Sequence, residues 1–575
     1  MKTPSQLLRD RLTPAFGTVA GVPVDPIVQR SQHADYQANG TLALARRLGA
    51  DPRELADRIL AEADLSGVVS AAEVSGPGFI NLTLADEVIG ALAGAALADD
   101  RIGVPRAARP DTVVVDYSAP NVAKEMHVGH LRSTVIGDAA VRVLEWAGHR
   151  VIKRNHLGDW GTPFGMLIEH LLDIGEGEAA HELSVGDLNG FYTAARRKFD
   201  ADDGFKERAR QRVVLLQGGD EATLRLWHLL VGESKRYFVS VYELLGVRLT
   251  DADFVGESAY NDELQPVVEE LDKLGLIQIS DGAKCVFPEG FTGRDGTPLP
   301  LIVQKSDGGF GYAATDLAAI RNRLRDLDAT RLLYVVGVPQ RQHFEMVFAT
   351  ARAAGWLTSQ ARAEHVGFGS VLGADGKVLR SRAGGTFKLV DLLGEAVDRA
   401  NTVVSEKNPD LAAAIRTEIA EQVGMGAVKY ADLSTDRVRD YVFDFDRMLA
   451  LDGNTAPYLQ YAHARIKSVF RRGDVAPVRD GSPVLITETA ERALALELLS
   501  FPDVLADVVE TLEFHRLAHY LFGVATTFTG FYEKCPILKA ETPALRESRL
   551  ALTDLTARVL ETGLDLLGIA APARM

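Results

Sequence analysis

Residues 113–165 decide the fold and read VVVDYSAPNVAKEMHVGHLRSTVIGDAAVRVLEWAGHRVIKRNHLGDWGTPFG. The stretch opens with a strand-forming run, Val113 to Tyr117, which ends at the turn cluster Ser-Ala-Pro-Asn. After His130, apolar residues recur on one helical face until Gly148 gives a stop signal. A second apolar pair, Val151-Ile152, begins another strand. Strand, helix and strand form a βαβ unit, which binds nucleotides at the carboxyl ends of its strands.

The composition is that of a soluble globular protein with several domains. The chain has 575 residues, enough for about three or four domains, and 46% of them are hydrophobic. No stretch approaches the roughly 20 apolar residues of a membrane span, and the first residues contain no secretory signal. Only Cys285 and Cys535 are present, which excludes a disulfide framework and a thiolate zinc cluster. We therefore expect a cytoplasmic protein with no membrane partner.

The regions around the βαβ unit differ in pattern. Residues 1–110 predict a small α+β domain, and residues 111–395 a Rossmann-like domain with an insertion at about 175–300. We expect Rossmann-like signals to resume at Leu301 to Val303, at Tyr312 to Ile320 and at Leu332 to Val336. Residues 396–452 predict a helical connecting segment and residues 453–575 a helical domain.

Net charge and local charge point in opposite directions. The formal charge of −16 argues against a nucleic-acid partner, because the overall field repels phosphate. Residues 457–472, however, combine an aromatic face with the cations Arg465, Lys467, Arg471 and Arg472. Such a stripe suits base stacking and phosphate contact.

The sequence His127-Val-Gly-His130 is the first candidate site. The two histidines share a helical face, and Gly129 leaves room for a base or a phosphate to approach the backbone. The helix N-terminus offers unpaired N–H groups to a polyphosphate. Alone, this motif is weak and favours a solvated turn that contains two histidines, but its place between a strand and a helix favours nucleotide binding. No third ligand stands at zinc spacing, so we predict no structural metal.

Two further groups are candidates for substrate contact. Lys377, Arg380 and Arg382 lie in a glycine-rich loop that can close over a triphosphate, although each taken singly fits an exposed basic turn. Tyr312 and Asp316 are four residues apart and face one site on a helix. The Asp carboxylate and the Tyr ring together suit the binding of a guanidinium group. The alternative to a binding role is that Tyr312 and Asp316 serve as a helix cap and in core packing.

The stretch SAPNVAKEMHVGH (118–130), together with NHLGDWG (155–161), resembles the signature of class I arginyl-tRNA synthetases. His127 to His130 is similar to that class's HIGH element, and Lys377 to Arg382 stands where its KMSKS element belongs. The likeness extends along the chain through DYQANG, GPGFIN, YAATD, GAVKYADLS, GNTAPYLQYA and FYEKCPIL.

The resemblance implies that ATP, as its Mg²⁺ complex, and L-arginine form arginyl-adenylate, and that the arginyl group then passes to tRNA. It implies a monomer that needs bound tRNA before it activates arginine, with the N-terminal domain on the tRNA elbow and the helical domain on the anticodon. The implied catalytic residues are His127, His130, Lys124, Lys377 and Arg380. The implied ATP ligands are His127, Gly129, His130 and Lys377. The implied arginine ligands are Ser118, Asn121, His130, Tyr312, Asp316 and Gln340. The implied tRNA contacts are Tyr458, Tyr461, Arg465, Lys467 and Arg471.

The chain departs from the family pattern near the expected amino-acid pocket. Arg380 replaces the second lysine of the loop, so Lys124 is the candidate for the compensating cation. Pro163 replaces a usual glutamine, and residues 337–339 differ from the usual polar ones, although Gln340 and His343 are kept. These changes motivate a second hypothesis, a duplicate enzyme for antibiotic self-resistance or for an arginine analogue. A small-molecule nucleotidyltransferase and a non-catalytic RNA-binding module are the remaining alternatives.

Overall fold

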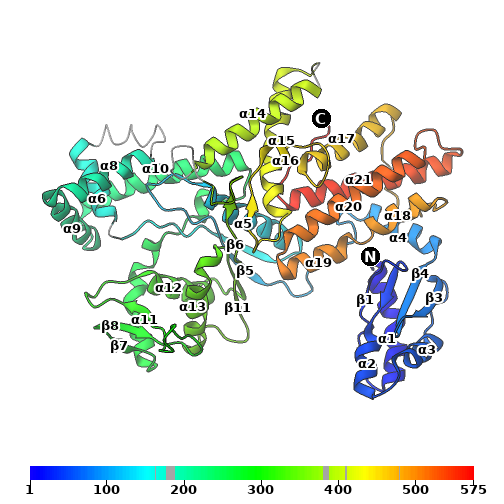
Figure 1. Ribbon diagram of the computed structural model, residues 1–575, viewed down its shortest axis with the longest axis horizontal. Coiled ribbons are helices and arrows are strands. Elements are labelled where there is room, and N and C mark those ends of the chain that lie inside the picture. The colour runs from blue at the N-terminus through cyan, green and yellow to red at the C-terminus, as the bar shows by residue number, and fades with distance from the viewer. Residues whose placement is uncertain (162, 176–187, 380–386, 408, 410, 478) are drawn as a thin grey trace. The chain divides into compact units, whose positions relative to one another are not determined.

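The computed structural model describes residues 1–575 except 162, 176–187, 380–386, 408, 410 and 478 (Figure 1). The chain divides into two compact units. Residues 107–449 form one unit, and residues 1–106 together with 450–575 form the other. In the described part of the chain, no helix is long and apolar enough to cross a membrane.

A parallel four-stranded sheet is the centre of the unit formed by residues 107–449. Its order is β11 (Arg362–His365), β10 (Arg331–Tyr334), β5 (Thr112–Asp116) and β6 (Arg150–Arg154). The interior strands β5 and β10 are buried almost throughout, as expected for a sheet that is covered on both faces. The predicted βαβ unit is therefore confirmed.

Helix α5 (Val128–Trp146) connects β5 to β6 and packs on this sheet. All of its predicted apolar face is buried, and Gly148 follows the helix end with φ +92°. The helix is also buried on much of its other side, where Arg132 and Asp138 are less than 3% exposed. Helices α12 (Tyr312–Arg325) and α13 (Arg341–Ala353) join β10 in a second apolar cluster.

Between β6 and β10 the chain forms helices and a separate small sheet. Besides α12, the described α-helices there are α6 (Pro163–Ile174), α8 (Leu188–Ala201), α9 (Asp203–Gln217), α10 (Glu221–Leu245) and α11 (Asn261–Lys273). The sheet contains β7 (Gln278–Ser280), β8 (Ala283–Val286) and β9 (Leu301–Gln304), all antiparallel.

The prediction that Leu301 to Val303 belongs to the Rossmann-like sheet is wrong. This segment is β9, which pairs with β8 instead. Its side chains alternate between buried and exposed, and Ile302 is 47% exposed. A short apolar run does not distinguish a strand buried on both faces from a strand with one solvated face.

A helical layer completes the unit that contains the parallel sheet. It consists of α14 (Leu389–Lys407), α15 (Ala413–Leu433) and the short α16 (Phe445–Met448). Strand β12 (Val371–Leu372) precedes this layer in the sequence. It pairs in parallel with β13 (Tyr441–Val442), which lies between α15 and α16. Arg132 on α5 donates to the Asp432 carboxylate on α15 at 3.0 Å, so a buried ion pair connects the layer to the βαβ unit.

The other unit contains an α+β domain and a helical domain. The α+β domain has α1 (Pro4–Ala20), α2 (Gly40–Leu48), α3 (Pro52–Glu62) and α4 (Asp86–Ala98). Its antiparallel sheet has the order β1 (Val28–Arg30), β2 (Tyr36–Ala38), β4 (Phe79–Leu84), β3 (Val69–Ser75). The helical domain has α17 (Ala456–Gly473), α18 (Thr489–Leu498), α19 (Phe501–Thr511), α20 (Phe514–Lys534) and α21 (Pro543–Leu566). The predicted fold class is confirmed for all three parts.

Candidate active site

The loops that follow the four parallel strands carry most of the candidate residues. Because these strands are parallel, their carboxyl ends lie at the same edge of the sheet. Residues 117–127 follow β5 and residues 155–159 follow β6. Residues 335–340 follow β10 and residues 366–370 follow β11. Parallel isolated bridges, Asn121 with Gly158 and Gly337 with Phe368, join neighbouring loops at this edge.

The two histidines form the N-terminal cap of α5. The Nδ1 atom of His127 accepts the Gly129 N–H at 3.0 Å, and the Nδ1 atom of His130 accepts the His127 N–H at 3.0 Å. The two ring centroids are 4.0 Å apart. A Cβ atom on Gly129 would lie 2.8 Å from the His127 ring, so the ring can fold back over the helix start only when this residue is glycine.

Both histidines are neutral at physiological pH. Burial and the nearby Lys124 lower the pKa of His127. Burial, together with His127, lowers the pKa of His130 to about 3. Because each Nδ1 accepts a backbone N–H, the proton of each neutral ring is on Nε2. The pair therefore presents N–H donors without a net charge.

Hydrogen bonds anchor the loop that precedes the histidines. Ser118 is buried, its Oγ lies 2.7 Å from the Tyr242 hydroxyl, and Thr134 donates to it at 2.9 Å. Asn121 is exposed, and a Cβ atom on Gly158 would lie 2.3 Å from its side-chain oxygen. Ser118 is therefore held by α5 and α10, while Asn121 lies against the loop after β6.

The guanidinium candidates lie at the start of α12 and beside it. Asp316 is paired with Nε2 of His343 on α13 at 2.6 Å. Tyr312, one turn earlier, is 74% exposed. Gln340 is exposed in the short 3₁₀ helix η3 (Val338–Gln340). The Asp316 carboxylate is thus oriented by a histidine that the sequence analysis noted but assigned no role.

Two further carboxyl groups belong to this region, and Glu257 lies within electrostatic reach of both Asp159 and Asp316. Asp159 accepts the Ser258 N–H at 2.9 Å and the Ser258 hydroxyl at 2.7 Å. Burial, together with the negative charges of Asp159 and Asp316, raises the pKa of Glu257 to about 8. A cationic ligand would favour the ionised form of Glu257, so this group of carboxyl side chains suits a guanidinium.

Sequence reasoning missed Asp159 and Glu257 for different reasons. Asp159 lies inside the quoted NHLGDWG motif but was assigned no role. A Cβ atom on Gly256 would lie 1.9 Å from the Asp159 carboxylate, so Gly256 permits the close approach of the two loops. Glu257 begins the short 3₁₀ helix η2 (Glu257–Tyr260), and no spacing rule singled out this acidic residue.

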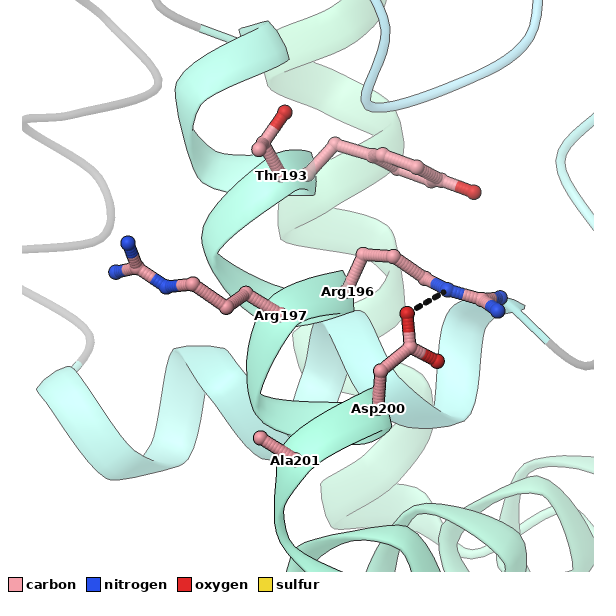
Figure 2. Close-up of a pocket in the computed structure, with 6 residues that line it drawn as sticks. Thr193, Arg196, Arg197, Asp200 and Ala201 are labelled. Atoms are coloured by element: carbon pink, nitrogen blue, oxygen red, sulfur yellow. Dashed lines mark hydrogen bonds and ion pairs between the residues drawn. The ribbon is translucent and has the colours of Figure 1, made fainter.

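The Lys124 side chain lies against helix α8. Its Nζ is 4.5 Å from the centroid of the Tyr192 ring, a cation–π distance. Tyr192 lines a shallow depression of about 500 Å³ together with neighbouring residues of α8. Figure 2 shows Arg196 turned toward Asp200, at 2.9 Å, whereas Arg197 points away from this pair.

The loop predicted to close over a triphosphate is described only in part. Lys377 is exposed in a hairpin in which Gly376 has φ +71°. Arg380 and Arg382 lie outside the described residues. After the loop, Lys388 pairs with the buried Glu125 at 2.9 Å, beside the histidine cap. This ion pair ties the end of the loop to the start of α5.

Three family models match consecutive parts of the chain. Residues 5–84 match "Arginyl tRNA synthetase N terminal domain" and residues 93–445 match "tRNA synthetases class I (R), catalytic domain". Residues 459–575 match "DALR anticodon binding domain". The chain is 56% identical to an arginine–tRNA ligase of Thermobifida fusca, over the full length of both proteins. It is 52% identical to one of Streptomyces coelicolor, covering 99% of this chain and 98% of that protein.

The chain belongs to the arginyl-tRNA synthetases.

Solved structures of this family have the same fold. The arginyl-tRNA synthetase of Plasmodium falciparum matches with a TM-score of 0.86 at 29% identity, covering 100% of both chains. That of Thermus thermophilus matches with a TM-score of 0.82 at 26% identity, covering 99% of this chain and 100% of that one.

In the helical domain of this arginyl-tRNA synthetase, α17 has two different faces. Tyr458, Tyr461 and Arg465 recur at helical spacing and share one face, to which Arg472 also belongs. Tyr461 is 48% exposed, and Arg465 lies over the Tyr532 ring of α20 at 4.2 Å.

The second face of α17 makes polar contacts with other parts of the domain, although Arg471 itself is exposed. Lys467 lies 3.4 Å from the Glu561 carboxylate, and Arg471 donates to the Ala573 carbonyl at 2.9 Å. Two of the predicted tRNA contacts are therefore engaged with the protein itself. Among the residues that the structure describes, no group of three or more His, Cys, Asp or Glu side chains is placed to hold a metal ion.

Proposed function

We propose that this protein attaches L-arginine to its tRNA by way of an arginyl-adenylate formed from ATP. The observation that carries the proposal is the combination of a neutral histidine pair with a cluster of carboxylates in the same unit. The histidines suit the phosphates of ATP, and the carboxylates suit the guanidinium of arginine. Family membership supports the same reaction.

In the first step, a carboxylate oxygen of arginine attacks the α-phosphorus of ATP. The bond from that phosphorus to the bridging oxygen breaks, and pyrophosphate leaves. The nucleophile is already ionised, so the protein needs to position the reactants and stabilise negative charge. We assign to His127, Gly129 and His130 the contacts with ATP, through Nε2–H donors and the exposed helix start.

The carboxylates of Asp316 and Glu257 are assigned to the guanidinium. Asp316 is the stronger candidate, because His343 orients it. Asn121, Tyr312 and Gln340 are exposed and free to contact the remainder of arginine, whereas the buried Ser118 shapes the loop. We propose that Mg²⁺ accompanies ATP as part of the substrate complex.

In the second step, a ribose hydroxyl of the terminal adenosine of tRNA attacks the adenylate carbonyl, and AMP leaves. The exposed aromatic face of α17, with Tyr458, Tyr461 and Arg465, is assigned to the anticodon side of the tRNA. The N-terminal domain is assigned to the tRNA elbow. We further propose a cytoplasmic monomer that activates arginine only with tRNA bound.

Lys124 is proposed to supply positive charge during adenylate formation, because Arg380 stands in place of the usual lysine. Lys377 is assigned to the phosphates from the same loop. For Lys124→Ala we expect a decrease of about 100-fold in kcat for arginine-dependent ATP–pyrophosphate exchange. The variant Lys124→Arg keeps the charge and is expected to retain part of the activity. Wild-type exchange by Lys124→Ala contradicts this assignment.

The decisive experiment measures ATP–pyrophosphate exchange with each amino acid, with and without tRNA. We expect exchange with arginine alone and only when tRNA is present. Preference for an arginine analogue would favour the duplicate-enzyme hypothesis that residues 337–339 and Pro163 motivated. Exchange without any amino acid would favour a small-molecule nucleotidyltransferase. Binding of tRNA without any exchange would favour a non-catalytic RNA-binding module.

A further inference from the structure

Residues 570–574 run along α17 and are held there by side chains of that helix. Gln460 donates to the Ala570 carbonyl at 2.8 Å. The Nδ1 of His463 lies 3.1 Å from the Pro572 carbonyl, and Arg471 donates to the Ala573 carbonyl at 2.9 Å. Figure 1 shows residue 575 beside α17. Hydrogen bonds to three of the four carbonyls of residues 570–573 thus define the path of this segment.

The segment is packed as part of the domain. His463 is 1% exposed, and Pro572 is buried against α17. Nδ1 of His463 donates to the Pro572 carbonyl. Nε2 of the same His463 ring lies 3.7 Å from the Glu561 carboxylate of α21. The backbone on the N-terminal side of Arg574 is therefore held by α17, and Glu561 of α21 lies against the other ring nitrogen of His463.

This path brings Arg574 to the end of α17. Burial lowers the pKa of Arg471, and the neighbouring positive charges of Arg574 and Arg472 lower it further. Arg471, Arg472 and Arg574 are all exposed. Within the described part of the chain, none of the three forms an ion pair with a carboxylate. In a protein with a net charge of −16, three adjacent arginines without a counter-charge are a local exception.

We propose that Arg471, Arg472 and Arg574 form a phosphate-binding patch for the tRNA backbone, and that Gln460 and His463 are positioning residues that hold Arg574 in this patch. The inference rests on the proposed function and adds Arg574, which the sequence prediction did not include, to the cations of α17. Arg472 shares its helix face with Tyr461 and Arg465, so the patch continues the aromatic face of α17. Guanidinium groups bind phosphate oxygens through paired N–H donors, which favours arginine at such a place.

The test is the salt dependence of tRNA binding. For Arg574→Ala we expect the slope of log K against log salt concentration to decrease by about 0.7–0.9, the contribution of one phosphate contact. The KM for tRNA is expected to increase several-fold, with kcat and the KM for arginine unchanged. Arg574→Lys keeps the charge and is expected to keep the slope. Arg516→Ala is the matched control, because Arg516 is an exposed arginine of the same domain that pairs with Asp507 and Glu513.

A separate set of variants tests whether Gln460 and His463 position Arg574. Gln460→Ala removes one tether, and we expect it to reduce the salt slope in the same direction as Arg574→Ala. Combining Gln460→Ala with Arg574→Ala is expected to add little, because both act through one guanidinium. His463→Asn keeps an N–H donor for the Pro572 carbonyl and is expected to preserve the slope better than His463→Ala.

Two results would overturn this inference. The first is that Arg574→Ala keeps the wild-type salt slope of tRNA binding and the wild-type KM for tRNA. The second is that the effects of Gln460→Ala and Arg574→Ala add fully in the double variant. Either result leaves the proposed function intact provided that the wild-type protein charges tRNA with arginine. Failure of the wild-type protein to charge tRNA contradicts the proposed function instead.

Discussion

At the scale of single residues, we propose that recognition of arginine depends most on Asp316. For Asp316→Ala we expect a loss of roughly 2–5 kcal/mol in transition-state stabilisation, since a buried guanidinium is left without its carboxylate. This corresponds to a decrease of about 30-fold to several-thousand-fold in kcat/KM for arginine, measured by aminoacylation. The control is Asp326→Ala, an exposed carboxylate near the other end of α12. Unchanged kinetics for Asp316→Ala would show that the pocket is elsewhere.

At the same scale, the raised pKa of Glu257 predicts that the KM for arginine depends on pH. Its pKa is raised from 4.5 to about 8, so without arginine the side chain is neutral at pH 7. A bound guanidinium favours the carboxylate, and binding below pH 8 therefore releases a proton. We expect the KM for arginine to decrease by up to about tenfold per pH unit as pH rises toward 8. Glu257→Gln is expected to abolish this slope, and a slope that persists in that variant rules out Glu257 as its source.

The raised pKa of Glu257 also affects folding. Between pH 4.5 and 8 the unfolded chain releases this proton while the folded chain keeps it, so stability decreases as pH rises. Glu257→Gln removes this contribution. Thermal unfolding of the two proteins from pH 5 to pH 8 measures the difference independently of arginine binding.

At the scale of elements, the ion pair between α5 and α15 holds the histidine helix against the helical layer. The side chains of Arg132 and Asp432 are 1% and 0% exposed. Arg132→Met leaves a buried carboxylate without its partner, and we expect a loss of roughly 3–5 kcal/mol in the free energy of unfolding. The double variant Arg132→Met with Asp432→Leu is expected to recover much of this loss in urea denaturation. Arg399→Ala, which breaks an exposed pair with Glu395, is expected to cost about 0–1 kcal/mol.

At the scale of the whole molecule, residues 1–106 and 450–575 form one compact unit although they are far apart in sequence. Arg492 of α18 binds the Asp35 carboxylate at 2.6 and 2.7 Å and the Asp86 carboxylate at 2.8 Å. At a second contact between the two domains, the Thr3 and Ser5 hydroxyls donate to the Asp503 carboxylate of α19. The N-terminal domain is therefore bound to the helical domain by charged and hydrogen-bonded groups.

We expect Arg492→Ala to weaken this association by roughly 2–5 kcal/mol, because Asp35 is nearly buried and loses its counter-charge. Hydrogen exchange of the β1 to β4 sheet is the measurement, and faster exchange there with unchanged exchange in the parallel sheet is the expected result. Affinity for a complete tRNA is expected to decrease, while affinity for an isolated anticodon stem-loop stays the same. Equal losses for both RNAs would instead indicate damage to the helical domain.

Much of the fold and part of the site could be predicted from the sequence. The βαβ unit followed from local periodicity, because strand and helix patterns in residues 113–152 agree with the packing that they adopt. The position of the two histidines at the start of a helix followed from a motif, whereas the structure showed that their rings cap that helix through contacts between residues three or fewer positions apart. Local chemistry determines such features, and a single sequence contains all of it.

Only the tertiary structure decided the rest. Strand β9 carries an apolar run that fits either sheet, and pairing with β8 decided between them. Glu257 lies 98 residues beyond Asp159, and only folding brings their charges together. Likewise, Arg472 and Arg574 are about 100 positions apart, and the hydrogen bonds of Gln460 and His463 bring them to one patch. The physical reason is that pairing partners, burial and charge proximity depend on contacts between distant parts of the chain, which local spacing does not encode.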